Sequence, residues 1–456
     1  MSEGNLEAPT RHQIPWRQAD FVDPGKIDAE LRRVFDICHG CRRCFNLCDS
    51  FPRLFNLIDE SKSGELDSVE STDFKPVMDA CTLCDICFMT KCPYVPPHEF
   101  DLDFPHLMLR YRAMEFKQGK VKFAHRQLTE IDRNGKLAGL VAPLANWATK
   151  RGNALIRPLL EKTAGIHQDA VLPNFNHSPF EKKRPKKLKE TPATLNNSGR
   201  KAALYATCFV NYNNLRIGEA TRAILAKNGV ATEIVYPSCC GMPQLEQGDL
   251  ARVAKNAKKV SAELVQWIDL GYDIVALVPS CTFMLKFEWP LIVPDDENIQ
   301  RLGKATFDTT EYIVDMAKKE GLAEGLSKLE GPVSLHLACH ARAQNMGPKA
   351  AEMLRLIPDT EIDVIERCSG HGGSWGVMKN NFEVALKVGR PTARKALESG
   401  AKYIVSECPL AREHILQGIE KLDEENAPKN VYSVQHPVQI LAHAYGLTGE
   451  NSQNDP

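Results

Sequence analysis

The chain has 456 residues, which predicts two to four domains, and 43% of its residues are hydrophobic. Its formal net charge is −1, so bulk charge attracts neither nucleic acid nor an anionic membrane. The N-terminus lacks the apolar segment of a secretory signal, and no run of about 18 apolar residues occurs that could span a membrane. Because 15 cysteines are typical of metal binding in a reducing compartment, we expect a cytoplasmic protein.

An N-terminal extension, residues 1–30, leads into two cysteine runs. In each run three cysteines stand three residues apart, and a fourth follows a few residues later. The two runs are Cys38, Cys41, Cys44 and Cys48, then Cys81, Cys84, Cys87 and Cys92. Zinc also binds Cys-x2-Cys pairs, but a third cysteine three residues on is surplus to a tetrahedral zinc site. The spacing therefore favours iron–sulfur clusters over zinc or disulfides.

The same spacing predicts how the two runs share their ligands. A short loop brings three thiolates to three irons of one [4Fe–4S] cluster, and the fourth cysteine of the run reaches the other cluster. The predicted ligands are Cys38, Cys41, Cys44 and Cys92 for cluster 1, and Cys81, Cys84, Cys87 and Cys48 for cluster 2. The long stretch between the runs, residues 51–80, predicts an elaborated helical dicluster ferredoxin-type domain over residues 31–165.

Residues 101–165 place polar and apolar residues at helical spacing. The segment from Leu137 to Leu160 is unusually apolar, with Trp147 shortly before Lys150 and Arg151. One interpretation is an amphipathic helix attached peripherally to the inner face of the cell membrane. The other, which we favour, is a helix packed against a neighbouring domain, because single amphipathic helices mostly face a protein core.

Residues 166–200 are expected to form a linker. From Glu181 to Arg200 the sequence is rich in lysine and poor in apolar residues, which is typical of a solvated segment. A docking site for an acidic electron donor is the alternative interpretation of the lysine run.

The C-terminal half contains an internal repeat. KAALYATCFVN at 201 matches PVSLHLACHAR at 332, and further cysteine segments match at offsets of about 130 residues. Each copy alternates short apolar runs with helical stretches, which predicts two α/β units with mostly parallel strands. The units cover residues 201–330 and 331–448, before a tail at 449–456. Each cysteine lies at or just past the end of a predicted strand, where open α/β sheets bind ligands.

In this plan the chain resembles the CCG-domain iron–sulfur oxidoreductases. That family includes one of the subunits of anaerobic glycerol-3-phosphate dehydrogenase, the iron–sulfur subunit of glycolate oxidase and heterodisulfide reductase. The likeness covers roughly residues 31–446 and is closest to the glycerol-3-phosphate dehydrogenase subunit in HLACHARAQNMG, SGHGGSWGVMKNNFEVALKVG and HPVQILAHAYG. It implies electron transfer from a flavin-containing dehydrogenase subunit toward membrane quinone, and non-cubane [4Fe–4S] clusters in CCG domains.

The first repeat departs from the full five-cysteine CCG pattern at one position, where Met284 replaces the last cysteine. Four thiolates still suffice for a [4Fe–4S] cluster or a zinc ion. The predicted ligands of this third site are Cys208, Cys239, Cys240 and Cys281.

The second repeat is degenerate, because Ser369 stands where the paired cysteine should be and Ala411 occupies the final position. Its remaining cysteines are Cys339, Cys368 and Cys408. His340 and His371 are candidates for a fourth ligand, since imidazole replaces thiolate in some iron–sulfur centres.

Four glycines in SGHGGSWG follow a predicted strand but lack the G-x-G-x-x-G spacing of a dinucleotide loop. They are Gly370, Gly372, Gly373 and Gly376. The loop aligns with CCGMPQ of the first repeat, where glycine allows the backbone to approach a cofactor closely. We find no flavin or nicotinamide motif, so hydride transfer by this chain alone is not expected.

Three functions fit these features. The favoured one is an electron-transfer protein that takes electrons from a flavoprotein dehydrogenase or a ferredoxin-like donor and passes them, through two [4Fe–4S] clusters and the first CCG site, to an acceptor such as quinone. The second is a reductase of the heterodisulfide reductase type, with Cys239 and Cys240 as candidate catalytic residues. The third is a non-catalytic docking protein that holds zinc or iron–sulfur clusters.

Overall fold

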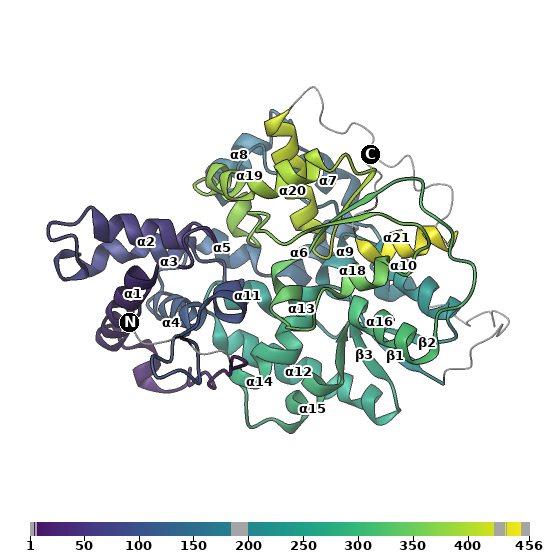
Figure 1. Ribbon diagram of the computed structural model, residues 1–456, viewed down its shortest axis with the longest axis horizontal. Helices are drawn as coiled ribbons and strands as arrows, with labels where there is room; N and C mark the ends of the chain where they lie inside the picture. The colour runs from purple at the N-terminus through teal and green to yellow at the C-terminus, as the bar shows by residue number, and fades with distance from the viewer. Residues whose placement is uncertain (1–3, 5–6, 184–198, 424–433, 435, 448–456) are drawn as a thin grey trace.

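The computed structural model describes residues 4, 7–183, 199–423, 434 and 436–447. The first part of a helical region, residues 7–117, lies at one end of the molecule, and the rest of that region, residues 118–165, runs beside the two α/β repeats that follow (Figure 1). Most of the lysine-rich stretch and the tail at 449–456 lie outside the described residues. The mixed helix-and-sheet organisation with two repeated units agrees with the sequence prediction.

The helical region begins with a helix that delivers the first cysteine run. Asp23 precedes this helix, α1, and its side chain accepts the backbone N–H of Lys26 at 2.8 Å, so one free N–H of the first turn is satisfied. The helix ends at Arg42, whose φ of 52° is left-handed and turns the chain toward Cys44. The helices of the region are α1 (Pro24–Cys41), α2 (Ser50–Asp59), α3 (Lys75–Ala80), α4 (Phe104–Lys117), α5 (Phe123–Leu128), α6 (Ile131–Leu140), α7 (Ala142–Thr149) and α8 (Arg157–Ala164).

The first repeat is built on a parallel sheet with strand order β2-β1-β3-β4. Its strands are β1 (Lys201–Tyr205), β2 (Ala231–Val235), β3 (Asp273–Ala276) and β4 (Thr306–Asp308). Its helices are α9 (Cys208–Tyr212), α10 (Leu215–Lys227), α11 (Met242–Glu246), α12 (Leu250–Asp269), α13 (Pro279–Phe283), α14 (Trp289–Ile292), α15 (Glu297–Ala305) and α16 (Thr309–Glu320). Four consecutive residues of β1 are buried, as expected for a strand that helices cover on both faces.

The second repeat has a smaller parallel sheet with strand order β6-β5-β7. Its strands are β5 (Val333–His336), β6 (Ile362–Ile365) and β7 (Tyr403–Ser406). Its helices are α17 (Cys339–Arg342), α18 (Lys349–Leu354), α19 (Phe382–Glu398), α20 (Pro409–Leu422) and α21 (Pro437–Ala444). The parallel pairing of both sheets confirms the predicted α/β units.

Every cysteine of the repeats follows the carboxyl end of a strand, as predicted. Cys208 and Cys339 are the first residues of α9 and α17, directly after β1 and β5. Cys408 lies between β7 and Pro409, and proline suits the first turn of α20 because it needs no N–H donor there. Parallel strands bring these loops to one edge of each sheet.

The hydrophobic cores join parts that are far apart in sequence. One core extends from the helical region, with Phe35 and Phe51, into the first repeat, with Leu245 and Trp289. A second core joins the two repeats and includes the apolar face of α21. The sheets are therefore held in a fixed relation to each other and to the cysteine loops of the helical region.

The N-terminal segment is fastened to both of its neighbours by Arg11. Its guanidinium bonds to Asp85 at 2.8 Å, to Asp103 at 2.7 Å and to Glu288 of the first repeat at 3.2 Å. It also lies over the ring of Phe88, 4.4 Å from the centroid. Burial alone would lower the pKa of Arg11, but Asp103 and Asp85 outweigh burial and hold it well above its ordinary value.

The apolar segment Leu137 to Leu160 packs through small residues and turns its large ones outward. Within it, a Cβ on Gly139 would meet the carbonyl of Asn176 at 3.0 Å, and just before it a Cβ on Gly135 would meet the ring of Tyr212 at 2.5 Å. On the outer side Leu140 is 72% exposed and Trp147 is 50% exposed. The favoured interpretation, packing against a neighbouring domain, therefore holds for only one face of this segment. No helix in the described ranges is long and apolar enough to cross a membrane.

Candidate functional site

The eight cysteines of the helical region gather in two groups. The thiol of Cys38 interacts electrostatically with those of Cys92, Cys44 and Cys41. The thiol of Cys48 interacts instead with those of Cys84 and Cys81, and that of Cys87 with both of these. The fourth cysteine of each run therefore lies beside the first three cysteines of the other.

The second group is the more enclosed, because Cys81 and Cys87 are buried, whereas the other six cysteines are partly exposed. Burial, followed by neighbouring thiols, raises the pKa of Cys44 to about 12. Burial and the thiol of Cys368 raise the pKa of Cys84 to about 12, and burial raises that of Cys92 to about 11. Thiols crowded in this way resist ionisation until a cation replaces their protons, which suits four-thiolate binding of a cationic iron–sulfur core.

The first repeat brings its four cysteines together at the edge of its sheet. The sulfurs of Cys208 and Cys239 are 3.8 Å apart. The thiol of Cys240 contacts those of Cys239 and Cys281, so the four sulfurs form a continuous chain. Hydrogen bonds from Cys208 and Cys240 lower the pKa of Cys239 well below its ordinary value, whereas these contacts and burial raise the pKa of Cys240. The donor set fits an iron–sulfur cluster or zinc by its chemistry.

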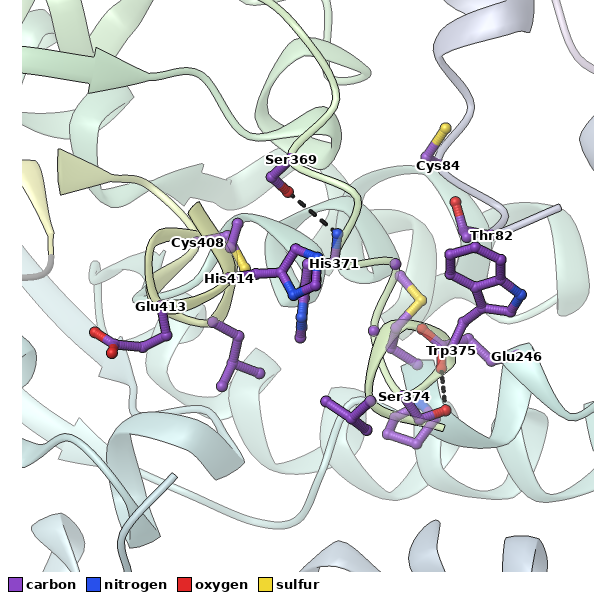
Figure 2. A pocket seen from close by; sticks show the side chains of 18 of the residues that line it. Thr82, Cys84, Glu246, Ser369, His371, Ser374, Trp375, Cys408, Glu413 and His414 are labelled. Atoms are coloured by element: carbon purple, nitrogen blue, oxygen red, sulfur yellow. Dashed lines mark hydrogen bonds between the residues drawn. The ribbon is translucent and has the colours of Figure 1, made fainter. Parts of the chain in front are cut away.

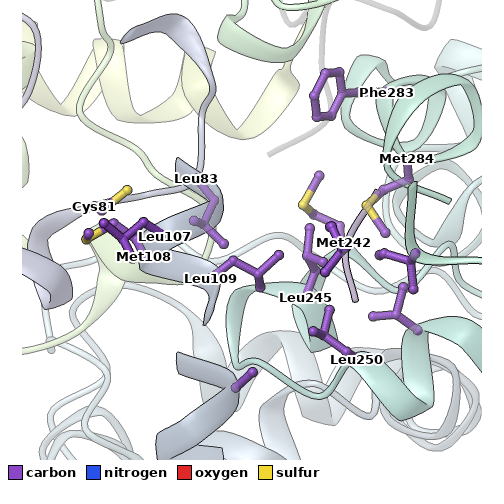
Figure 3. Packing of buried hydrophobic residues seen from close by; sticks show 14 of the residues in the cluster. Cys81, Leu83, Leu107, Met108, Leu109, Met242, Leu245, Leu250, Phe283 and Met284 are labelled. Carbon is purple, nitrogen blue, oxygen red and sulfur yellow. The ribbon is translucent and has the colours of Figure 1, made fainter. Parts of the chain in front are cut away.

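The backbone around this site is fixed by hydrogen bonds from neighbouring elements. Trp289 donates its indole N–H to the carbonyl of Cys240 at 3.0 Å, and Tyr205 donates its hydroxyl to the carbonyl of Ser238 at 2.7 Å. Met284, which stands at the fifth cysteine position, is buried near Met242 in the first core (Figure 3). A thioether in that core does not replace the missing thiolate.

One residue of this site comes from the helical region and was not found from the sequence. Asp132, in the first turn of α6, accepts the backbone N–H of Cys239 at 2.9 Å and the hydroxyl of Tyr236 at 2.5 Å. A single aspartate among the polar residues at the start of a helix forms no motif, and its partners lie more than 100 residues away. Only the tertiary structure connects it to the cysteines.

The cysteine loops of the second repeat face both the helical region and the first repeat, which also pack directly on each other. The thiol of Cys339 interacts with those of Cys84, Cys368 and Cys408. Cys408 in turn interacts with Cys281 of the first repeat. The degenerate repeat thus places its three remaining thiols next to sulfurs of both neighbours.

Of the two histidine candidates, His340 is already bonded at both ring nitrogens. Its Nδ1 lies 2.8 Å from the hydroxyl of Ser280, and its Nε2 lies 3.2 Å from the carbonyl of Leu83. The ring also stacks on Phe283, with centroids 5.2 Å apart. His340 therefore connects the loop of the second cysteine run to the first repeat and has no nitrogen left for a metal.

His371 stands in a different environment, close to a second histidine that the sequence did not single out. Its ring lies 6.1 Å from that of His414 on α20, and the Nε2 atoms of both are buried without a hydrogen-bond partner among the described residues (Figure 2). Burial lowers the pKa of His371 to about 3, so this imidazole is neutral.

Across the described ranges, no group of three or more His, Cys, Asp and Glu side chains is arranged to hold a metal ion.

The sequence suggested that the glycines of SGHGGSWG approach a cofactor, but in the structure they approach other parts of the protein. A Cβ on Gly370, whose φ is +79°, would overlap the carbonyl of Ala385. One on Gly372 would meet Thr82 in the second cysteine run at 2.5 Å, and one on Gly373 would overlap the carboxylate of Glu246 in the first repeat. The loop needs glycine because three neighbours fill the space that side chains would take.

A large cavity of about 3550 Å³ joins the second cysteine group of the helical region to the cysteines of both repeats. Its walls come from the helical region and from both repeats, and they carry cysteines of each. Those cysteines are Cys48, Cys81, Cys84, Cys208, Cys240, Cys281, Cys339, Cys368 and Cys408. The arrangement lines one internal space with thiols from three parts of the chain.

Comparisons with known proteins agree with the two repeats. Residues 202–286 and 333–411 match the family model of the cysteine-rich domain, CCG. The C subunit of the anaerobic glycerol-3-phosphate dehydrogenase of Escherichia coli (strain K12) is 25% identical over 323 residues, which are 70% of this chain and 76% of that protein. Lactate utilization protein A of Bacillus licheniformis is 29% identical over 188 residues, 39% of this chain and 75% of that protein.

A third relative is an uncharacterized iron–sulfur protein of Methanocaldococcus jannaschii. It is 26% identical over 247 residues, which are 53% of this chain and 46% of that protein. The chain thus carries two cysteine-rich CCG domains, and its relatives include an iron–sulfur protein and a dehydrogenase subunit.

Proposed function

We propose that this chain is an iron–sulfur electron-transfer subunit of an oxidoreductase. Its electrons come from a flavoprotein dehydrogenase or a ferredoxin-like donor, and an acceptor such as quinone removes them. Two cysteine groups of the helical region hold [4Fe–4S] clusters, and the first repeat holds a third, non-cubane cluster. The relatives named for a dehydrogenase subunit and an iron–sulfur protein support this assignment.

The observation that carries the proposal is a series of neighbouring thiols that crosses the cavity. The series runs Cys84, Cys339, Cys408, Cys281 and Cys240. It begins at the predicted cluster 2, passes the second repeat and ends in the four-cysteine group of the first repeat. Bound clusters would supply one-electron acceptance and release at its two ends.

The protein's own part is to bind, orient and enclose these centres. Cys239 and Cys240 are 3% and 1% exposed, so the protein shields these two sulfurs of the first repeat from bulk water. Enclosure of this kind is one of the factors that set the potential of an iron–sulfur centre, together with hydrogen bonds to its sulfurs. A flavin is not required within the chain if a dehydrogenase partner carries out the two-electron chemistry.

Replacing Cys240 by alanine is expected to abolish the third centre and leave the first two. The wild-type chain, purified anaerobically, should contain about twelve irons, and Cys240→Ala about eight, because one four-iron cluster loses a ligand. Iron, sulfide and zinc analysis measures the content, and EPR of reduced and oxidised protein measures which signals remain. Reduction of an acceptor by the variant should fall to background.

The control is Met284→Leu, a volume-conserving change at the vacated fifth position, which should keep about twelve irons. About eight irons in the wild type, with zinc in the first repeat, would instead favour the docking function. Turnover of a disulfide by the chain alone, lost in Cys240→Ala, would favour the reductase.

An apolar patch on the helical region supports peripheral contact with a membrane. Of the twelve exposed large hydrophobic side chains in the described ranges, seven lie within Leu137 to Leu160. The patch consists of Leu137, Leu140, Val141, Leu144, Trp147, Leu155 and Leu159. On a soluble surface such a concentration of apolar side chains marks a site of interaction.

The charged residues around the patch favour contact with a lipid surface. No aspartate or glutamate occurs between Arg133 and Leu160, and Lys136 and Lys150 are exposed at the edges of the patch. Arg151 is exposed there too and pairs with Glu420 of α20 at 2.6 Å. Leucine and tryptophan flanked by basic residues are typical of helices that lie at the interface of an anionic bilayer. Contact with lipid would also bring the chain to an acceptor dissolved in the membrane.

Leu140→Ser combined with Leu144→Ser is expected to weaken binding to lipid vesicles at least about tenfold, because two buried side chains are lost from the bilayer. The measurement is flotation with vesicles of phosphatidylcholine and phosphatidylglycerol. The matched control is Leu270→Ser with Leu356→Ser, which removes two leucines that are 63% and 40% exposed elsewhere. If the wild-type protein stays in the soluble fraction, the proposed contact with lipid is wrong.

A further inference from the structure

Asp132 is the acidic residue that the structure places closest to the backbone of the first-repeat cysteines. It belongs to α6, outside both CCG domains, yet its two oxygens face the first repeat. Oδ2 accepts the N–H of Cys239 at 2.9 Å, and Oδ1 accepts the hydroxyl of Tyr236 at 2.5 Å. Asp132 also interacts electrostatically with the thiols of Cys208 and Cys239.

The two hydrogen bonds fix the carboxylate relative to the sulfurs. Gly135, one turn further along α6, packs on the ring of Tyr212, so the helix cannot move away from the first repeat without opening this contact. Tyr212 in turn lies edge-on to Tyr236, with centroids 5.9 Å apart. The position of Asp132 is therefore set by packing as well as by its own bonds.

A fixed negative charge next to a thiolate-bound centre makes the addition of an electron less favourable. Reduction adds one electron and no proton, so the centre becomes more negative while Asp132 keeps its charge. The carboxylate also occupies the N–H of Cys239, a dipole that would otherwise be available to stabilise the reduced centre. Both effects have the same sign and lower the reduction potential.

We propose that Asp132 is a positioning residue that lowers the reduction potential of the centre held by Cys208, Cys239, Cys240 and Cys281. The inference rests on the proposed function, because it requires a redox-active centre in the first repeat. It goes beyond that function in giving the helical region control over the last centre of the chain.

Asp132→Asn is expected to raise the midpoint potential of the first-repeat centre. The amide keeps an acceptor oxygen for Cys239 and removes the charge. We expect at least a tenfold rise in the ratio of reduced to oxidised centre at fixed potential, which is about 59 mV for one electron. Burial raises the pKa of Asp132, so the mediated redox titration is made at about pH 8, well above the ordinary aspartate pKa. EPR follows the signal that Cys240→Ala abolishes.

Tyr236→Phe is expected to shift the same potential in the opposite direction, because loss of the hydroxyl leaves the charge of Asp132 less compensated. Opposite signs would not arise from general loosening of the site. Glu130→Gln is the matched control: it removes one negative charge two residues away, where Glu130 pairs with Arg252 at the surface, and should leave the potential unchanged.

The outcomes distinguish failure of this inference from failure of the proposed function on which it rests. A wild-type first repeat without a redox signal removes both. A normal signal whose potential is the same in Asp132→Asn, or equally shifted in Glu130→Gln, overturns the inference alone. If Asp132→Asn does not load the centre, Tyr236→Phe decides: a lower potential supports the role of Asp132, and an unchanged one contradicts it.

Discussion

Replacing Cys48 by serine is expected to destroy the cluster of the second cysteine run and to leave the cluster of its own run intact. The reason is geometric, because Cys48 lies beside Cys84 and Cys81 of the second run. The iron content should fall by about four per chain. EPR of the reduced protein should lose one signal, the same one that Cys84→Ser removes.

The mirror-image control is Cys92→Ser, which should remove the signal that Cys38→Ser removes. Cys92 ends the second run but lies beside the thiol of Cys38 in the first group. If Cys48→Ser and Cys38→Ser abolish the same signal, each run holds its own cluster and the crossed assignment is wrong.

Replacing Arg11 by methionine is expected to lower the free energy of unfolding by about 3–5 kcal/mol. Methionine keeps most of the apolar stem but removes the guanidinium that Asp85, Asp103 and Glu288 share. Asp103 and Glu288 then keep only the imidazole of His106, 3.3 Å from each. The side chains of the three acidic residues are 4%, 19% and 2% exposed, so water cannot take over the role of the guanidinium. Calorimetry of anaerobic protein should show a lower melting temperature.

Arg301→Met is the control for this substitution. Its partner is Asp269, and the two side chains are 48% and 57% exposed, so the loss should be below about 1 kcal/mol. Equal effects of the two changes would mean that the buried carboxylates near Arg11 protonate or rehydrate at little cost. A lower free energy of unfolding in Arg11→Met alone would establish that this network holds the N-terminal segment, the second cysteine run and the first repeat together.

The features that were predictable from sequence are those that depend on local order. Parallel strands alternate with helices along the chain, and a cysteine after each strand must reach the carboxyl edge of its sheet. For that reason the places of Cys208, Cys281 and Cys408 followed from the repeat alone. The ligand sets and the domain boundaries given from spacing remain predictions.

Features that depend on the packing of distant segments were not predictable. Arg11 and Asp132 stand in stretches without a motif, and their partners lie 74 to 277 residues away for Arg11 and 104 or 107 for Asp132. The sequence suggested that the glycine loop approaches a cofactor, because spacing alone does not reveal which atoms lie against the loop. The structure places Ala385, Thr82 and Glu246 against it instead.

The shared core has a consequence for how this protein can be divided. A shortened chain that starts at residue 199 would keep both CCG domains complete, yet it would lack Asp132 beside Cys239 and Thr82 beside Gly372. It would also expose Leu245 and Trp289, which share a core with Phe35 and Phe51. Boundaries drawn by sequence family therefore do not mark where this chain can be cut, and its centres are better dissected by single substitutions than by truncation.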